Sequence, residues 1–175
     1  MTSVLKVDNI QNSSGTDAIS IDSNGVVTQP AKVAFHVHPS ANVDYTGVND
    51  DDELLIMNTA VTNIGNHYNT TTGKFTAPVA GMYFFSANVR FDNFSNSEYA
   101  RVMITVATDG SPWNNYSDTF STIVGNQQST NYHSLTVSGC LYLNANDVVM
   151  LRGGHRNDTS YSMGPESQFS GFLVG

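Results

Sequence analysis

The chain has 175 residues and a mass of 18.9 kDa, which suits one compact domain with a short extra segment. It carries 7 lysines and arginines against 15 aspartates and glutamates, a net charge of −8. It therefore lacks the basic surface with which proteins bind nucleic acids and anionic membranes. No apolar run is long enough for a membrane-spanning helix, which argues against membrane insertion. Aromatic residues make up 10% and charged residues only 13%, a balance that favours an all-β protein with many loops.

The first unit of the chain is predicted to be residues 1–30. Two short apolar runs, at residues 4–10 and 18–22, are separated by polar turns, and Asn24-Gly25 between apolar residues is typical of a hairpin. Thirty residues with few large side chains cannot bury a core alone. We therefore expect this segment to pack on copies of itself or on another protein; the alternative is a flexible tail.

Residues 31–175 are predicted to form the second unit, and they show no helical pattern. Strand-like runs occur at residues 32–38, 54–61, 82–91, 99–107, 133–143, 148–152 and 169–174. In the third run, Tyr83 and Phe85 lie on one face, while the other face begins with Met82 and Phe84 and then becomes polar. A strand that is apolar on both faces is covered on both sides. Together with short strand-like segments at residues 67–68 and 75–76, these runs make eight or more antiparallel strands, which predict a two-sheet sandwich of jelly-roll type.

A family resemblance strengthens this interpretation. Six residues follow the pattern Asn-x4-Tyr-x6-Phe-x5-Gly-x-Tyr-x-Phe, namely Asn63, Tyr68, Phe75, Gly81, Tyr83 and Phe85. The pattern resembles the signature of the globular head of complement component C1q, a member of the tumour-necrosis-factor-like jelly rolls. The resemblance implies a ten-stranded jelly roll that assembles as a homotrimer. It also implies six residues of the core or trimer interface, which are Tyr68, Phe75, Tyr83, Phe85, Phe169 and Phe172.

The N-terminal segment carries a second, shorter resemblance. Residues 5–15 and 21–25 are similar to the openings of structural proteins of tailed phages, especially cyanophages. No collagen-like repeat precedes the head, and the N-terminus lacks the apolar core of a signal peptide.

The two resemblances together imply a non-enzymatic virion protein, which would be a trimeric fibre-type or spike-type appendage made in the host cytoplasm. Residues 1–30 would dock on other virion proteins, and the head would bind a host-surface glycan or protein or another virion protein. The alternative is a non-viral, soluble, trimeric lectin-like or cytokine-like binding protein with the same head.

No catalytic residues are predicted, because no nucleophile elbow or known catalytic spacing surrounds the histidines. The acidic run at residues 50–53 is consecutive, which scatters its side chains over a turn. We expect a solvated loop there, with calcium ligation as the alternative. The single cysteine, Cys140, precedes an apolar strand-like run and is expected to be buried.

Receptor contact, if the head makes it, is predicted for two aromatic loops. Trp113, Asn115 and Tyr116 lie in one, and Tyr161 lies in the other. Aromatic rings stack on sugar faces and also anchor protein interfaces, while amides and hydroxyls hydrogen-bond to sugars. The alternative for Trp113 is that it packs inward and holds a long loop in place.

A metal site is considered at Phe35-His36-Val37-His38. In a strand, Phe35 and Val37 point to one face and the two histidines to the other. The family resemblance implies that this strand faces the trimer axis, where three chains would bring six imidazoles together, enough for a transition metal. The alternative is that both histidines are ordinary polar residues of a hydrated surface or interface. Apart from such a metal or a calcium ion, no cofactor is expected.

Overall fold

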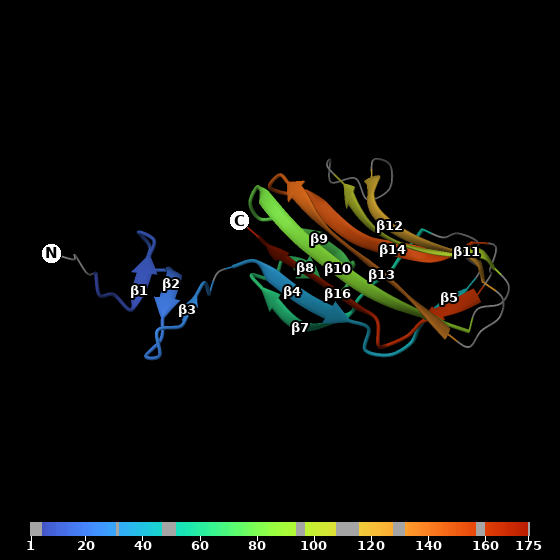
Figure 1. The fold of residues 1–175 in the computed structure, drawn as a ribbon, viewed down its shortest axis with the longest axis horizontal. Coiled ribbons are helices and arrows are strands. Elements are labelled where there is room, and N and C mark those ends of the chain that lie inside the picture. The colour runs from blue at the N-terminus through green and yellow to red at the C-terminus, as the bar shows by residue number, and fades with distance from the viewer. Residues whose placement is uncertain are drawn as a thin grey trace.

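The computed structural model describes residues 5–30, 32–46, 52–93, 97–107, 116–127, 132–156 and 160–174. Within these ranges the chain forms sixteen strands and no helix (Figure 1). The strands are β1 (Asn9–Gln11), β2 (Asp17–Ile21), β3 (Val27–Thr28), β4 (Ala34–His38), β5 (Val43–Thr46), β6 (Glu53–Leu54), β7 (Thr59–Ile64), β8 (Tyr68–Asn69), β9 (Lys74–Thr76), β10 (Gly81–Asp92), β11 (Ser97–Ala107), β12 (Tyr116–Gln127), β13 (Tyr132–Leu143), β14 (Val148–Arg156), β15 (Ser160–Met163) and β16 (Gln168–Leu173). In this part of the chain nothing resembles a helix that could cross a membrane.

Two antiparallel sheets pack face to face and form the sandwich. The first runs β5-β15-β10-β16-β4-β7, with β13 also paired to β10, and we call it the β10 sheet. The second runs β12-β11-β14-β9-β8, with β6 also paired to β14. Neighbours such as β4 and β16 are far apart in sequence, as expected for a jelly roll. The predicted all-β, antiparallel, two-sheet jelly roll is confirmed.

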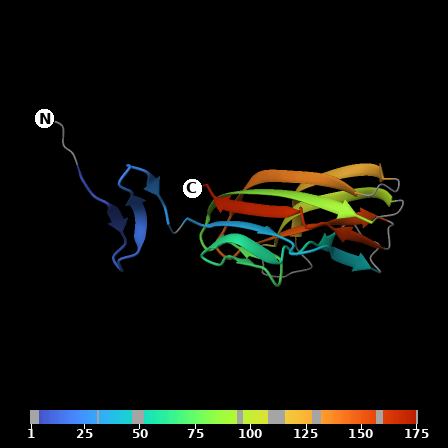
Figure 2. The same ribbon diagram turned by 90° about the horizontal axis from the view of Figure 1, so that it is seen from below.

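Residues 9–28 form a small sheet of their own, in the order β1-β2-β3. No pairing joins this small sheet to the sandwich among the described strands. Figures 1 and 2 show it beyond the end of the sandwich at which the C-terminus lies. Its turns follow the sequence: Asn12 and Asp22 accept hydrogen bonds from backbone N–H groups of the turns that follow them, and Gly25 has φ +80°. The division near residue 30 stays a prediction.

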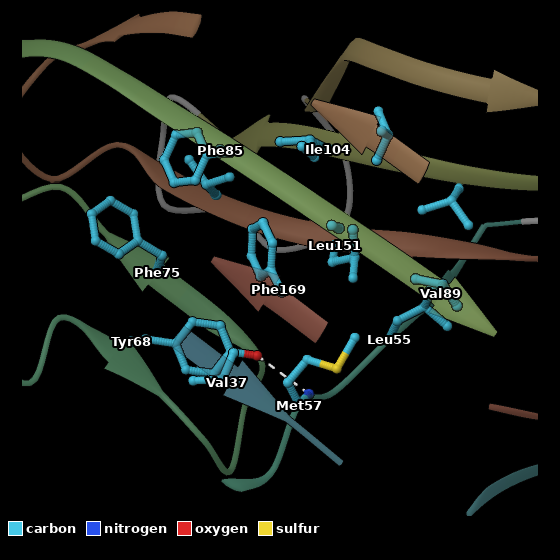
Figure 3. Close-up of a cluster of buried hydrophobic side chains, with 14 of the residues drawn as sticks. Val37, Leu55, Met57, Tyr68, Phe75, Phe85, Val89, Ile104, Leu151 and Phe169 are labelled. Atoms are coloured by element: carbon cyan, nitrogen blue, oxygen red, sulfur yellow. Dashed lines mark hydrogen bonds between the residues drawn. The ribbon is translucent and has the colours of Figure 1, made fainter. Parts of the chain in front are cut away.

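The core lies between the two sheets and is built on aromatic rings (Figure 3). Phe35 lies 5.0 Å from Tyr68 and 5.2 Å from Phe75, measured between ring centroids. Phe75 in turn packs edge-on against Tyr83 at 5.6 Å and Phe85 at 5.5 Å. Interlocked rings bury large apolar areas in few residues, which allows a chain of this size to close a core.

Two expectations about local structure are wrong. The apolar run at 54–61 is not one strand: β6 ends at Leu54 and β7 begins at Thr59, and Leu55 and Met57 fill the core from the segment between them. Cys140 is exposed, because it lies on the outward side of β13, next to the buried Leu141. Leu135, Val137, Leu141 and Leu143 alternate along the strand and fill the core, and this alternation places Cys140 on the opposite face.

Candidate functional site: the outer face of the β10 sheet

The exposed side of strands β4, β16, β10 and β13, here called the outer face, carries three zones of different chemistry. Strand β10 is the organising element, because it pairs with β13 along its whole length and with β16 along half of it. Its odd-numbered residues from Tyr83 to Phe91 enter the core and its even-numbered residues point to the outer face. This confirms the two-faced pattern expected for residues 82–91.

The first zone is an apolar patch, defined as Met82, Phe84, Tyr142 and Phe172. Met82 faces Tyr142 across the β10–β13 pair, and Phe84 faces Phe172 across the β10–β16 pair with their ring centroids 5.4 Å apart. Met82 and Phe172 are each 40% exposed, and Tyr142 is 65% exposed. Contiguous exposed apolar side chains on a soluble domain mark an interaction surface.

The second zone is a polar hollow of about 410 Å³ in the middle of the outer face. It is lined by His36, Ser86, Asn88, Thr136, Gln168 and Ser170. Asn88 donates a hydrogen bond from Nδ2 to Thr136 Oγ1 at 2.9 Å, and the His36 Nδ1 atom lies 3.0 Å from Ser170 Oγ. The hollow exists because Ser86 and Ser170 have short side chains, while the other lining residues around them are larger. Of the described residues that line the hollow, only His36 carries an acidic or basic side chain.

The third zone is charged. Arg90 holds Asp92 through two hydrogen bonds, from Nε at 2.9 Å and from Nη2 at 2.6 Å, and forms an ion pair with Glu166. The Tyr132 ring lies under the same guanidinium at 5.7 Å. The bonds to Asp92 raise the pKa of Arg90 above its ordinary value, so this end of the face keeps a fixed positive group between two carboxylates.

Five of the six residues expected at the core or trimer interface are core residues. Tyr68, Phe75, Tyr83, Phe85 and Phe169 are at most 2% exposed. Phe172 differs: it belongs to the apolar patch on the outer face. The Asn63 side chain explains part of the signature, since it donates to the Tyr68 carbonyl at 2.7 Å and accepts from the Tyr68 N–H at 3.2 Å. Burial raises the pKa of the Tyr68 hydroxyl, which accepts a hydrogen bond from the Met57 N–H (Figure 3).

The residues predicted for receptor contact do not form one described site. Trp113 and Asn115 lie outside the described residues. Tyr116 is the first residue of β12, not a loop residue. The loop placement of Tyr161 is wrong: it lies in β15, is 2% exposed, and stacks on Tyr45 with ring centroids 5.1 Å apart. Pairing of β15 with β5 and β10 draws Tyr161 into the sheet.

A small hollow beside Tyr161 was not foreseen from the sequence. It measures about 120 Å³ and is lined by Asp44, Tyr45, Thr46, Asn93, Ser160, Tyr161 and Ser162. Ser162 donates to Asp44 at 2.7 Å and accepts from the Asn93 side chain at 3.2 Å. Only the fold brings these residues together, because Asp44 and Ser162 are 118 positions apart in the sequence.

The candidate metal ligands are placed as expected on the outward side of β4. Phe35 and Val37 are buried at 3% and 0% exposure, and His36 and His38 are half-buried. In the acidic run, Asp52 pairs with Arg152 at 3.0 Å and Glu53 begins β6, while residues 50 and 51 lie outside the described part. Within the described residues of one chain, no three potential ligands gather closely enough to hold a metal. Both metal hypotheses therefore stay predictions.

A pair of histidines lies under the far end of β10. The His155 side chain is fully buried, and its ring centroid lies 5.0 Å from those of His133 and Phe91. Burial lowers the pKa of His133 below its ordinary value of 6.5, and the nearby Asp92 carboxylate offsets part of that effect. The neutral ring is therefore the form that the fold favours.

We expect folding stability to fall on acidification through this histidine. As the pH drops below 6.5, His133 becomes protonated in the unfolded chain but stays neutral in the folded chain. The free energy of unfolding therefore decreases until the pH reaches the lower pKa of the folded state. One group contributes at most about 1.4 kcal/mol per pH unit in that window. Urea unfolding of the native chain and His133→Gln at pH 7.5 and 5.5 measures this. The variant should lose less stability than the native chain between the two pH values, and an equal loss in both proteins would contradict the assignment.

Comparison with known proteins places this geometry in a family. The family model of the C1q domain matches residues 34–174. A complement C1q subcomponent of Rattus norvegicus is 30% identical over 122 residues, which cover 69% of this chain and 43% of that protein. The chain therefore spans less than half the length of this curated relative.

Solved structures agree in fold. The globular domain of zebrafish complement 1qA superposes with a TM-score of 0.53 at 18% identity and covers 82% of this chain and 98% of that one. Eiger TNF from S. frugiperda gives 0.61 at 13% identity, with 83% and 94% covered, and murine APRIL at pH 8.0 gives 0.59 at 16% identity, with 81% and 97% covered. At these identities the likeness concerns the fold alone. Since the family model covers nearly the whole sandwich, the chain belongs to the C1q domain family.

Proposed function

We propose that the chain is a non-enzymatic binding module that assembles as a homotrimer through the outer face of the β10 sheet. The apolar patch is the observation that carries this proposal: Met82, Tyr142 and Phe172 expose large apolar surfaces side by side on a regular sheet. Covering such surface contributes about 25 cal/mol per Å². A second copy of the chain is the occupant that fits, because homotrimers are typical of the jelly-roll family to which the chain belongs.

The trimer is further proposed to be a virion appendage of a phage, made in the host cytoplasm and docked through residues 1–30. The small N-terminal sheet supports docking, because Ile10, Val26 and Val27 are 47%, 54% and 60% exposed on it. Three short strands with their apolar side chains in water gain stability when a partner covers them. The resemblance of residues 5–15 and 21–25 to phage structural proteins favours another virion protein as that partner.

The head is proposed to bind a repetitive surface, either a host-cell glycan or protein or another virion protein. A trimer presents each weak site three times, and the resulting avidity exceeds the affinity of one site. Trp113 and Asn115, which were predicted from the sequence, remain proposed ligand-binding residues. Asp44 and Asn93 line the hollow beside Tyr161 and are proposed as further polar contacts for a ligand. No catalytic role is assigned to any of them.

A second candidate is a non-viral soluble binding protein with the same head. It is favoured by one observation, the 30% identity to an animal complement protein. The two candidates differ in where the chain is found. Mass spectrometry of purified phage particles from the source should detect the chain at a multiple of three copies per particle. A chain that is absent from such particles but present in uninfected cells would reject the virion role and support the second candidate.

A further inference from the structure

Two imidazoles of the outer face, those of His36 and His38, lie on the same side of one strand. His36 and His38 are two residues apart on one side of β4, about 7 Å along the strand, so both rings can approach one ion. The His38 Nδ1 atom lies 2.8 Å from the carbonyl oxygen of Pro39. A carbonyl only accepts, so Nδ1 carries the proton and Nε2 carries the lone pair. Metal-binding histidines typically make this kind of hydrogen bond with the nitrogen that does not ligate.

His36 has a similar neighbour. Its Nδ1 atom lies 3.0 Å from Ser170 Oγ, and when Nδ1 donates to that hydroxyl, Nε2 carries the lone pair that can bind a metal. The polar hollow of about 410 Å³ that His36 lines offers room for an ion with its waters. No lysine or arginine is among the described residues that line the hollow, so none of them repels a cation, and the chain has a net charge of −8.

One chain alone is not enough, since its described residues bring no third ligand near these two. The outer face is also the surface through which the proposed trimer forms. Three copies of that face would supply three times two imidazoles, and nitrogen ligands in that number suit an octahedral transition metal. Imidazole favours Zn²⁺, Ni²⁺ and Cu²⁺ over calcium or magnesium, which prefer oxygen ligands.

We propose that the trimer binds a divalent transition metal between its three chains through Nε2 of His36 and His38. The inference rests on the proposed trimer, because the partner copies complete the site. The ion would link the three chains at the polar centre of the outer face, beside the apolar patch. It would stabilise the assembly, and chelation would weaken it without unfolding the sandwich.

The test uses the full chain produced without a polyhistidine tag, stripped with EDTA, and then dialysed against Zn²⁺. Elemental analysis and light scattering are done on the same sample. The expected result is a trimer with about one Zn²⁺ per three chains, lost in His36→Ala and in His38→Ala. His67→Ala, which changes an imidazole outside the outer face, and Thr136→Ala, which changes another residue of the hollow, are controls that should retain the zinc.

The outcomes separate the two proposals. A trimer that holds no zinc, or whose zinc persists in both His36→Ala and His38→Ala, overturns the metal site and leaves the trimer standing. A monomer with or without zinc overturns the trimer, and the metal site with it. Folding of the variants is checked by circular dichroism.

Discussion

Gly153→Ala should destabilise the sandwich by about 3 kcal/mol. Gly153 lies in the middle of β14, opposite Val102 on β11 and Glu53 on β6. A Cβ atom at this position would overlap the carbonyl oxygen of Arg101 and approach the Val102 Cα at 3.1 Å. Both are backbone atoms of a paired strand, so they cannot yield without opening the β11–β14 ladder. Urea unfolding at a fixed chain concentration measures the loss.

The matched control is Gly125→Ala on β12. Among the described residues, no atom beyond the adjacent positions lies within 4 Å of the Cβ that this substitution would add, so its effect should stay within about 0.5 kcal/mol. A Gly153→Ala protein as stable as the native chain would show that β14 does not approach β11 as closely as described.

Phe172→Asp should turn the trimer into a folded monomer. The Phe172 ring belongs to the apolar patch, is 40% exposed in the single chain, and packs on Phe84. In the proposed trimer this substitution would bury a carboxylate in an apolar contact, which costs several kcal/mol per chain. The monomer should stay folded, because the core residues beneath are untouched. Analytical ultracentrifugation measures assembly, and near-UV circular dichroism checks the fold.

Ile123→Asp provides the control for charge alone. Ile123 is a large apolar residue with 56% exposure, like those of the patch, but it lies on β12 of the other sheet. This variant should remain trimeric. Dissociation by Ile123→Asp together with persistence of the trimer in Phe172→Asp would move the interface to the β12 sheet.

Much of the fold could be predicted because several strands carry a period-two pattern. Residues 82–91 alternate so regularly that both the core face and the outer face follow from the sequence, and Phe35 and Val37 are placed correctly for the same reason. The signature positions are explained by local bonds, such as those between Asn63 and Tyr68.

Other elements could not be read from local pattern. Strands β5 and β15 are only four residues long, and each contains one tyrosine between polar residues. This local pattern is typical of a loop. Strand β15 pairs with β5, 118 positions away at Asp44 and Ser162, and also with β10, and these pairings leave Tyr161 only 2% exposed. The polar hollow was missed for a similar reason: Asn88 and Thr136 are ordinary polar residues in the sequence and meet through the β10–β13 register. Long-range pairing decides such positions, and local sequence carries little information about it.

The central claim is that the outer face of the β10 sheet is an interface between copies of this chain. Its most direct test is the molar mass of the unmodified, tag-free chain in solution, determined by multi-angle light scattering across a range of chain concentrations. Three times 18.9 kDa, maintained down to micromolar concentration, is the predicted result. A stable folded species of 18.9 kDa over the same range would contradict it, because the apolar patch would then be exposed to water in the native state.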